Sequence, residues 1–130
     1  MALSTTLTSG GTAAATVSYQ EIKQGDACYI PVTIYLNGEA VTTDTLLLID
    51  KVEFMLGKCV RKVVDAAEAW NDTLGAFLCP LLQGDTLHMR PGLYDFDCRV
   101  MFYGGGVLGV RRKERLRVLD ANSWEVIHGD

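Results

Sequence analysis

The strongest constraint on the fold lies between Leu93 and Tyr103, where apolar and charged residues alternate with a period of two. Successive side chains of a β-strand point to opposite faces, so this stretch predicts a strand with one buried face and one solvated face. The residues of the buried face are Tyr94, Phe96, Cys98, Val100 and Phe102, and those of the solvated face are Asp95, Asp97 and Arg99. A second layer must cover the apolar face.

Gly104 to Gly106 follow this strand and predict a turn, because glycine adopts positive φ without steric cost. A second strand is expected to return from Val107 to Val118, forming a β-hairpin. Arg112 and Glu114 fall on the apolar parity of this returning strand, which predicts a bulge or an overhang beyond the core.

The charges of the two strands are expected to pair. With Gly105 at the centre of the turn, Asp97 lies opposite Lys113 and Asp95 opposite Arg115. An acid–base pair of Asp95 and Asp97 is the alternative reading, but it needs a cleft and unequal environments. A solvated face with surface ion pairs of about 0.2–1 kcal/mol explains the residues better.

Shorter strands are expected before the hairpin. The evidence is a set of runs rich in β-branched and aromatic residues, separated by turn signals such as Asn37-Gly38. For residues 46–64 we favour two strands joined near Gly57-Lys58, with a helix as the alternative, and residues 65–74 hold a short helical turn. The other expected strands are Val17–Lys23, Ala27–Leu36, Glu39–Val41 and Ala76–Leu82. Pro31 and Pro80 each remove a backbone donor, which predicts free edges or bulges there.

These strands predict an all-β fold of about seven to eight antiparallel strands in two packed sheets. A closed barrel would show the same periodicity, so the barrel remains an alternative to the two-sheet sandwich. The expected organisation is a flexible arm over residues 1–16, the sandwich over 17–119 and a tail over 120–130.

Composition and charge argue against some classes of function. The chain has 130 residues, 48% of them hydrophobic, and a net charge of −4, which is typical of a globular protein and argues against a surface built for nucleic acid. No window approaches the roughly 20 apolar residues of a membrane-spanning helix. Residues 1–16 lack the basic start and apolar core of a secretory signal, so we expect synthesis to end in the cytosol.

The sequence contains no catalytic, cofactor or metal motif that we can identify. His88 and His128 are forty residues apart and are expected in loops or on the surface. No G-x-S-x-G motif or phosphate-binding loop occurs. The cysteines are single, widely spaced and set in apolar runs, and we expect all four, Cys28, Cys59, Cys79 and Cys98, to be reduced core residues.

Two resemblances follow from the motifs. The run DTLHMRPGLYDFDC, from Asp85 to Cys98, resembles the approach to the F strand of immunoglobulin-like domains, although Tyr94 lies four residues before the cysteine instead of two. Cys28 would be the B-strand counterpart, but no Trp follows it at the C-strand distance. A closer resemblance is carried by the segments IPVTIYLNGEAVT, VEFML, GAFLCPLL and PGLYDFDCRVMF, followed by a basic closing strand. They resemble the immunoglobulin-like β-sandwich domains of bacteriophage tails, in particular the N-terminal domain of phage baseplate upper proteins, which implies an immunoglobulin-like β-sandwich for this chain.

This resemblance implies a non-enzymatic virion or prophage structural component that docks against other tail subunits, and a location in the virion after synthesis in the host cytoplasm. It implies no cofactor, nucleic acid or membrane partner. We expect docking to tail subunits or to a second copy through open edges and terminal arms. The candidate residues are Trp124, Val126, Ile127, Arg111, Lys113 and Arg115. A ligand-binding sandwich, such as a carbohydrate-binding or adhesion module, is the alternative.

Overall fold

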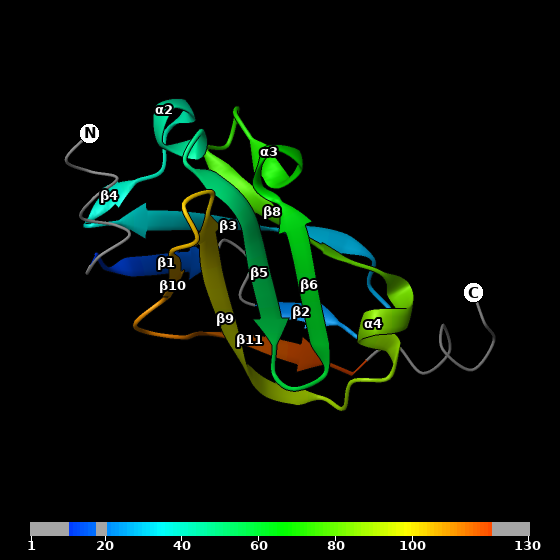
Figure 1. The fold of residues 1–130 in the computed structure, drawn as a ribbon. Coiled ribbons are helices and arrows are strands. Elements are labelled where there is room, and N and C mark those ends of the chain that lie inside the picture. The colour runs from blue at the N-terminus through cyan, green and yellow to red at the C-terminus, as the bar shows by residue number, and fades with distance from the viewer. Residues whose placement is uncertain (1–10, 18–20, 121–130) are drawn as a thin grey trace.

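The computed structural model describes residues 11–17 and 21–120. In this part of the chain two β-sheets pack face to face, as Figure 1 shows. The five-stranded sheet consists of β1 (Ala13–Val17), β3 (Cys28–Leu36), β4 (Glu39–Ala40), β7 (Trp70–Asn71) and β8 (Ala76–Leu81). The six-stranded sheet consists of β2 (Glu21–Lys23), β5 (Ile49–Leu56), β6 (Val60–Asp65), β9 (Gly92–Phe102), β10 (Val107–Gly109) and β11 (Glu114–Leu119). The predicted all-β sandwich is confirmed.

The strand order is that of an immunoglobulin-type sandwich. The first sheet runs β1-β3-β8-β7, which corresponds to A-B-E-D, and the second runs β11-β9-β5-β6, which corresponds to G-F-C-C′, with β2 added beside β11. The described residues thus form two sheets and not a closed barrel. The described residues form more strands than the seven to eight predicted, because the expected strands Val17–Lys23 and Val107–Val118 are each divided in two and β7 was not predicted.

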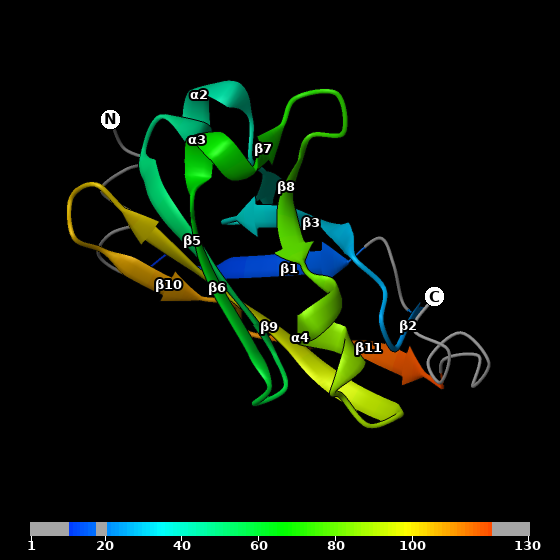
Figure 2. The ribbon, with the colours of Figure 1, turned by 90° about the vertical axis from the view of Figure 1, so that its right-hand side faces the viewer.

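Within the described residues, three short helices connect the strands: α2 (Thr43–Leu46), α3 (Ala66–Ala69) and α4 (Gln83–Leu87). Figure 2 shows α3 near one end of β8 and α4 at the other end. The predicted helical turn in residues 65–74 is confirmed by α3. The helix alternative for residues 46–64 is wrong, because β5 and β6 form a hairpin there, with Gly57 at φ 56° in its turn.

The core follows the alternation of the strands. On β9, Phe96, Cys98, Val100 and Phe102 are buried, while Asp95 and Arg99 are exposed and Asp97 is half-buried. The ring of Phe96 contacts that of Phe54 on β5, with centroids 6.2 Å apart. The facing layer contributes β3, whose buried side chains are Ile30, Val32, Ile34 and Leu36. Each fully buried side chain of this size stabilises the fold by about 1.5–3 kcal/mol.

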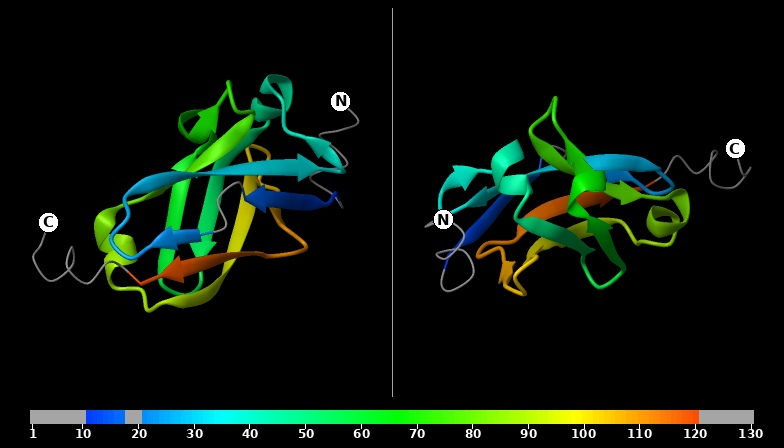
Figure 3. Two further views of the ribbon diagram at one scale, coloured as in Figure 1. Left: turned by 180° about the vertical axis from the view of Figure 1, so that it is seen from behind. Right: turned by 45° about the horizontal axis from the view of Figure 1, so that its top comes forward.

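The N-terminal boundary of the sandwich differs from the prediction. Residues 13–16, assigned to a flexible arm, belong to β1, which pairs with β3 from Ala13 opposite Leu36 to Val17 opposite Val32 (Figure 3). The side chains of Ala13 and Val17 are buried. Alanine and threonine carry little apolar signal, so pairing with β3 and not local composition makes this strand. Residues 1–10 lie outside the described residues.

The predicted single strand Val17–Lys23 is wrong as well. Val17 ends β1 in one sheet, and Glu21 begins β2 in the other, where β2 runs parallel to β11 and buries Ile22. A parallel neighbour so distant in sequence leaves no local signal. Both strands do lie at sheet edges, as the imperfect pattern indicated.

The returning strand after Gly104–Gly106 is interrupted. Val107 pairs with Met101 in β10, and Glu114 pairs with Phe96 in β11, so the register shifts by two residues between them. Residues 110–113 form the irregular connection, in which Val110 N–H donates to the Cys98 carbonyl at 3.0 Å. The predicted bulge is confirmed, and a continuous strand from Val107 to Val118 is wrong.

In the part of the chain that the structure describes, Pro80 lies on a free edge, as predicted. It stands in β8 beyond Phe77, the last residue that β7 covers, and it pairs only with Tyr29 of β3. Pro31 lies inside the sheet, next to the point where the described part of β1 ends opposite Val32. Among the described residues, neither proline therefore interrupts a ladder that has strand partners on both sides.

The cysteines are free thiols, but they are not all in the core. Cys79 and Cys98 are buried, Cys28 is half-buried and Cys59 is exposed. Cys59 lies in the turn between β5 and β6, where its N–H donates to the Leu56 carbonyl at 3.2 Å. The apolar run around it belongs to two strands that turn at this position, so the predicted burial of Cys59 is wrong.

Candidate interaction surfaces

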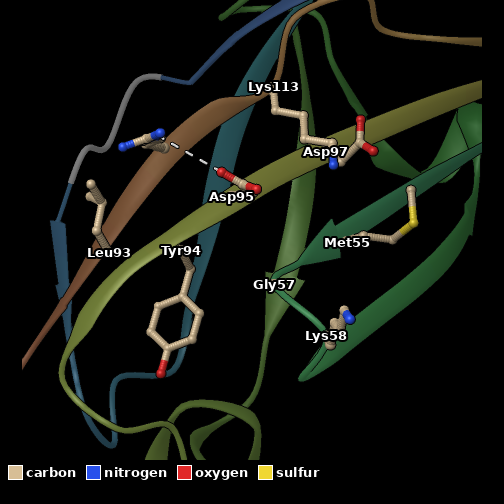
Figure 4. Close-up of a pocket in the computed structure, with 9 residues that line it drawn as sticks. Met55, Gly57, Lys58, Leu93, Tyr94, Asp95, Asp97 and Lys113 are labelled. Carbon is tan, nitrogen blue, oxygen red and sulfur yellow. Dashed lines mark ion pairs between the residues drawn. The ribbon is translucent and has the colours of Figure 1, made fainter.

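A pocket opens where β9 extends past the end of β5. Leu56 of β5 is the last residue opposite β9, and the preceding part of β9 pairs only with β11. The resulting cavity of about 490 Å³ is open to solvent and is drawn in Figure 4. Three kinds of side chain line it. The cations are Lys58, Lys113 and Arg115, the carboxylates are Asp95 and Asp97, and the remaining lining residues are Met55, Gly57, Leu93 and Tyr94. We call it the β9 pocket.

Tyr94 fixes one wall of the β9 pocket. Its hydroxyl donates to the Arg90 carbonyl at 2.6 Å, four residues upstream. Such a bond at the start of the F strand is the tyrosine corner of immunoglobulin-type sandwiches. The Gly57 N–H donates to the Asp95 carbonyl at 2.8 Å, which holds the β5–β6 turn against β9. The pocket is therefore built from backbone that is held in place on both sides.

Of the two predicted charge pairs, Asp95–Arg115 is confirmed and Asp97–Lys113 is not. Arg115 lies opposite Asp95 in the register, with Nε 3.9 Å from Oδ1, and the side chains are 66% and 56% exposed. At that exposure the pair is worth well under 1 kcal/mol. Lys113 lies outside β11, and no ion pair joins it to Asp97 among the described residues. Instead, Asp97 Oδ1 accepts a hydrogen bond from the Cys98 N–H at 2.9 Å.

The connection between β10 and β11 carries an unpaired cluster of cations. Arg111, Arg112 and Lys113, which we call the basic turn, are all exposed. Within residues 11–17 and 21–120, none of their side chains forms an ion pair. The turn is anchored by its backbone, since the Arg111 N–H donates to the Ala13 carbonyl of β1 at 3.1 Å. The structure thus brings two predicted residues, Lys113 and Arg115, to the β9 pocket and places Arg111 in the adjoining turn.

A buried carboxylate on the outer face of the six-stranded sheet was not predicted. Glu53 is 2% exposed and lies between Arg61 and Arg99, which form ion pairs with its two oxygens. The distance from Arg99 Nη1 to Glu53 Oε1 is 3.6 Å, and Oε1 has no hydrogen-bond partner in the described structure. The alternation places Glu53 on the polar parity, and nothing local shows that two arginines from neighbouring strands cover it.

The remaining candidates are placed as follows. Trp124, Val126 and Ile127 lie outside the described residues, as does His128. His88 is exposed after α4. Among the described residues no group of three His, Cys, Asp or Glu side chains is arranged to hold a metal ion. No helix in this part of the chain is long and apolar enough to cross a membrane.

Comparison with known proteins does not assign this chain to a family. No protein-family model matches the chain, and no curated protein matches it. Among solved structures, the chain is similar to the crystal structure of the extracellular domain of the putative hybrid two-component system BT4673 from B. thetaiotaomicron, at 10% sequence identity and a TM-score of 0.37. The match covers 90% of this chain and 16% of that one. The fold assignment therefore rests on the strand order and the buried faces described above.

Proposed function

We propose that this protein is a non-enzymatic structural component of a bacteriophage or prophage tail, and that it docks onto an acidic surface of a neighbouring tail subunit through the basic turn and the β9 pocket. The tail proposal rests on the resemblance of several sequence motifs to phage β-sandwich domains. The docking surface follows from the geometry of the described residues.

One observation carries the docking proposal: three exposed cations, which form no ion pair with any described residue, lie beside a pocket that has apolar walls. Arg111 and Lys113 belong to a chain of net charge −4, so the basic turn is a local reversal of the overall charge. Protein interfaces place apolar contacts at the centre and charges at the rim, where the charges steer association and set specificity. Leu93 and Met55 supply the apolar part of the β9 pocket.

The test is co-purification with the tail proteins encoded beside the gene, using matched charge reversals. Arg111→Glu/Lys113→Glu removes two cations of the surface. Lys23→Glu/Arg90→Glu makes the same charge change at two exposed positions outside it. We expect the first variant to lose at least about tenfold in affinity and the second to bind like the parent, and we expect binding to weaken with salt.

The docking proposal fails if no neighbouring gene product binds, or if both double variants bind like the parent. The virion location has its own measurement. Mass spectrometry of purified particles from the host should find the chain in a fixed ratio to known tail subunits, and particles without it would exclude a tail role.

A ligand-binding sandwich is the second candidate, and the size of the β9 pocket favours it. Small-molecule sites usually have volumes of about 300–1,000 Å³. Asp97 and Lys58 offer an acceptor and a donor for a polar ligand such as a sugar. In a screen of glycans by NMR, shifts centred on Leu93 and Met55 with none at Arg111 would favour this function over docking.

A further inference from the structure

A second surface, apolar and distant from the basic turn, lies where β3 begins and β8 ends. A groove of about 200 Å³ is lined by Ala27, Cys28, Tyr29, Pro80, Leu81 and Leu82, and we call it the β3–β8 groove. Tyr29 and Leu82 are 63% and 62% exposed although both are large and apolar. Large apolar side chains that gather around a groove indicate a contact surface.

The groove borders a free strand edge. β7 covers β8 only at Ala76 and Phe77, so Leu78 to Leu81 have no strand partner on the side away from β3 within the described residues. The edge and the groove together offer both backbone and apolar contacts to a short extended segment.

The last described residues lead towards this groove. The Leu119 carbonyl at the end of β11 accepts a hydrogen bond from Gln24 N–H at 3.0 Å, and Ala27 of the groove is three residues beyond Gln24. Thr86 of α4 donates to the Asp26 carbonyl at 2.8 Å, so α4 closes the same end of the sandwich. Figure 1 shows β11 ending on the side where α4 lies.

The sequence after β11 contains apolar residues that suit the apolar β3–β8 groove. Trp124, Val126 and Ile127 form an apolar cluster within a polar segment. From Leu119, the five residues to Trp124 span up to about 17 Å when extended, which reaches the groove from Gln24. A tethered segment acts at an effective concentration of about millimolar, so even a weak apolar contact is occupied.

We infer that residues 121–130 of the same chain cover the β3–β8 groove, with the side chains of Trp124, Val126 and Ile127 against Tyr29 and Leu82. This contact is separate from the docking surface of the proposed function. It completes the sandwich on the edge that β7 leaves open, and it leaves the basic turn free.

The experiment follows the indole N–H signals of Trp70 and Trp124 by NMR in the full chain, assigned with Trp124→Phe. Tyr29→Ser removes the exposed ring of the groove, and Tyr103→Ser removes a ring that is 70% exposed in the turn after β9. We expect the Trp124 signal to move towards its position in an unstructured peptide in Tyr29→Ser and to stay unchanged in Tyr103→Ser.

A chain cut after Asp120 provides the second readout. We expect it to melt about 3 °C or more below the full chain, and both should be monomers by light scattering. A Trp124 signal already at its unstructured position, or one that is insensitive to Tyr29→Ser, would overturn the inference. A full chain that is a dimer beside a truncated monomer would overturn it too, because the segment would then occupy a second copy.

Discussion

A side chain at position 57 would collide with Tyr94, since a Cβ built on Gly57 lies 2.8 Å from Cδ1 of the Tyr94 ring. Gly57 has φ +56°, a conformation that L side chains rarely adopt. The turn of the β5–β6 hairpin can approach β9 this closely only with glycine. The relationship joins the turn of one hairpin to the tyrosine corner of the next strand.

The first prediction is that Gly57→Ala destabilises the fold by about 2–4 kcal/mol, from backbone strain and from the clash with the Tyr94 ring. Gly38→Ala is the matched control, because Gly38 has φ +82° and no atom within 4 Å of a built Cβ. It should cost only the strain, about 1–2 kcal/mol. Urea unfolding measures both, and equal losses would mean that the Tyr94 contact adds nothing.

The second prediction concerns the tyrosine corner. Tyr94→Phe removes the hydrogen bond from the Tyr94 hydroxyl to the Arg90 carbonyl and should cost about 0.5–1.5 kcal/mol. Tyr103→Phe removes a hydroxyl from an exposed ring and should change the stability by less than about 0.5 kcal/mol. Denaturant midpoints of the two variants compare them directly, and matching midpoints would show that the corner has no energetic role.

The third prediction is non-additivity around Glu53. Arg61→Gln/Arg99→Gln leaves a buried carboxylate without its cations, and we expect a loss of about 2–4 kcal/mol. Adding Glu53→Gln to that variant should restore at least half of the loss, because a neutral amide is less costly to bury. A double-mutant cycle by chemical denaturation measures the coupling. Additive losses would argue against a cooperative cluster.

The fourth prediction separates the thiols by reactivity. Cys59 is exposed and should react rapidly with a thiol reagent in the native protein, whereas Cys79 and Cys98 should react only after unfolding. Titration in denaturant without reductant should find four thiols. A count of two, with Cys28 linked to Cys98 in peptide mapping, would instead indicate the antibody-type disulfide.

The fifth prediction is a loss of stability at alkaline pH. Burial raises the pKa of Cys79 and of Cys98 to about 12, from an ordinary value of 9.0. As the pH rises, the unfolded chain therefore loses these two thiol protons before the folded chain does. The free energy of unfolding is unaffected by this difference below pH 9 and falls as the pH rises from 9 towards 12. Unfolding midpoints between pH 8 and pH 11 should fall less in Cys79→Ala/Cys98→Ala than in the parent, and parallel curves would contradict this.

The alternation on β9 could be predicted because it depends on residues two positions apart in the chain. Phe96 and Cys98 share a face whatever they pack against, and Asn37-Gly38 specifies a tight turn through the backbone conformation of those two residues alone. Centring the turn on Gly105 predicted the pairing of Asp95 with Arg115, but Val107 pairs with Met101, so these two residues lie opposite each other only because the register shifts by two residues before β11.

Other features depend on partners far away in sequence. β1 is a strand because β3 supplies its hydrogen bonds, and Ile22 is buried because β2 lies beside β11, almost a hundred residues later. The burial of Glu53 needs Arg61 and Arg99 from the two neighbouring strands. Local periodicity therefore determined which residues form the principal strands and which of their faces are apolar. Only the tertiary structure decided which sheet each strand joins, which edges stay open and where the charges meet, because those outcomes depend on pairing energies between distant segments.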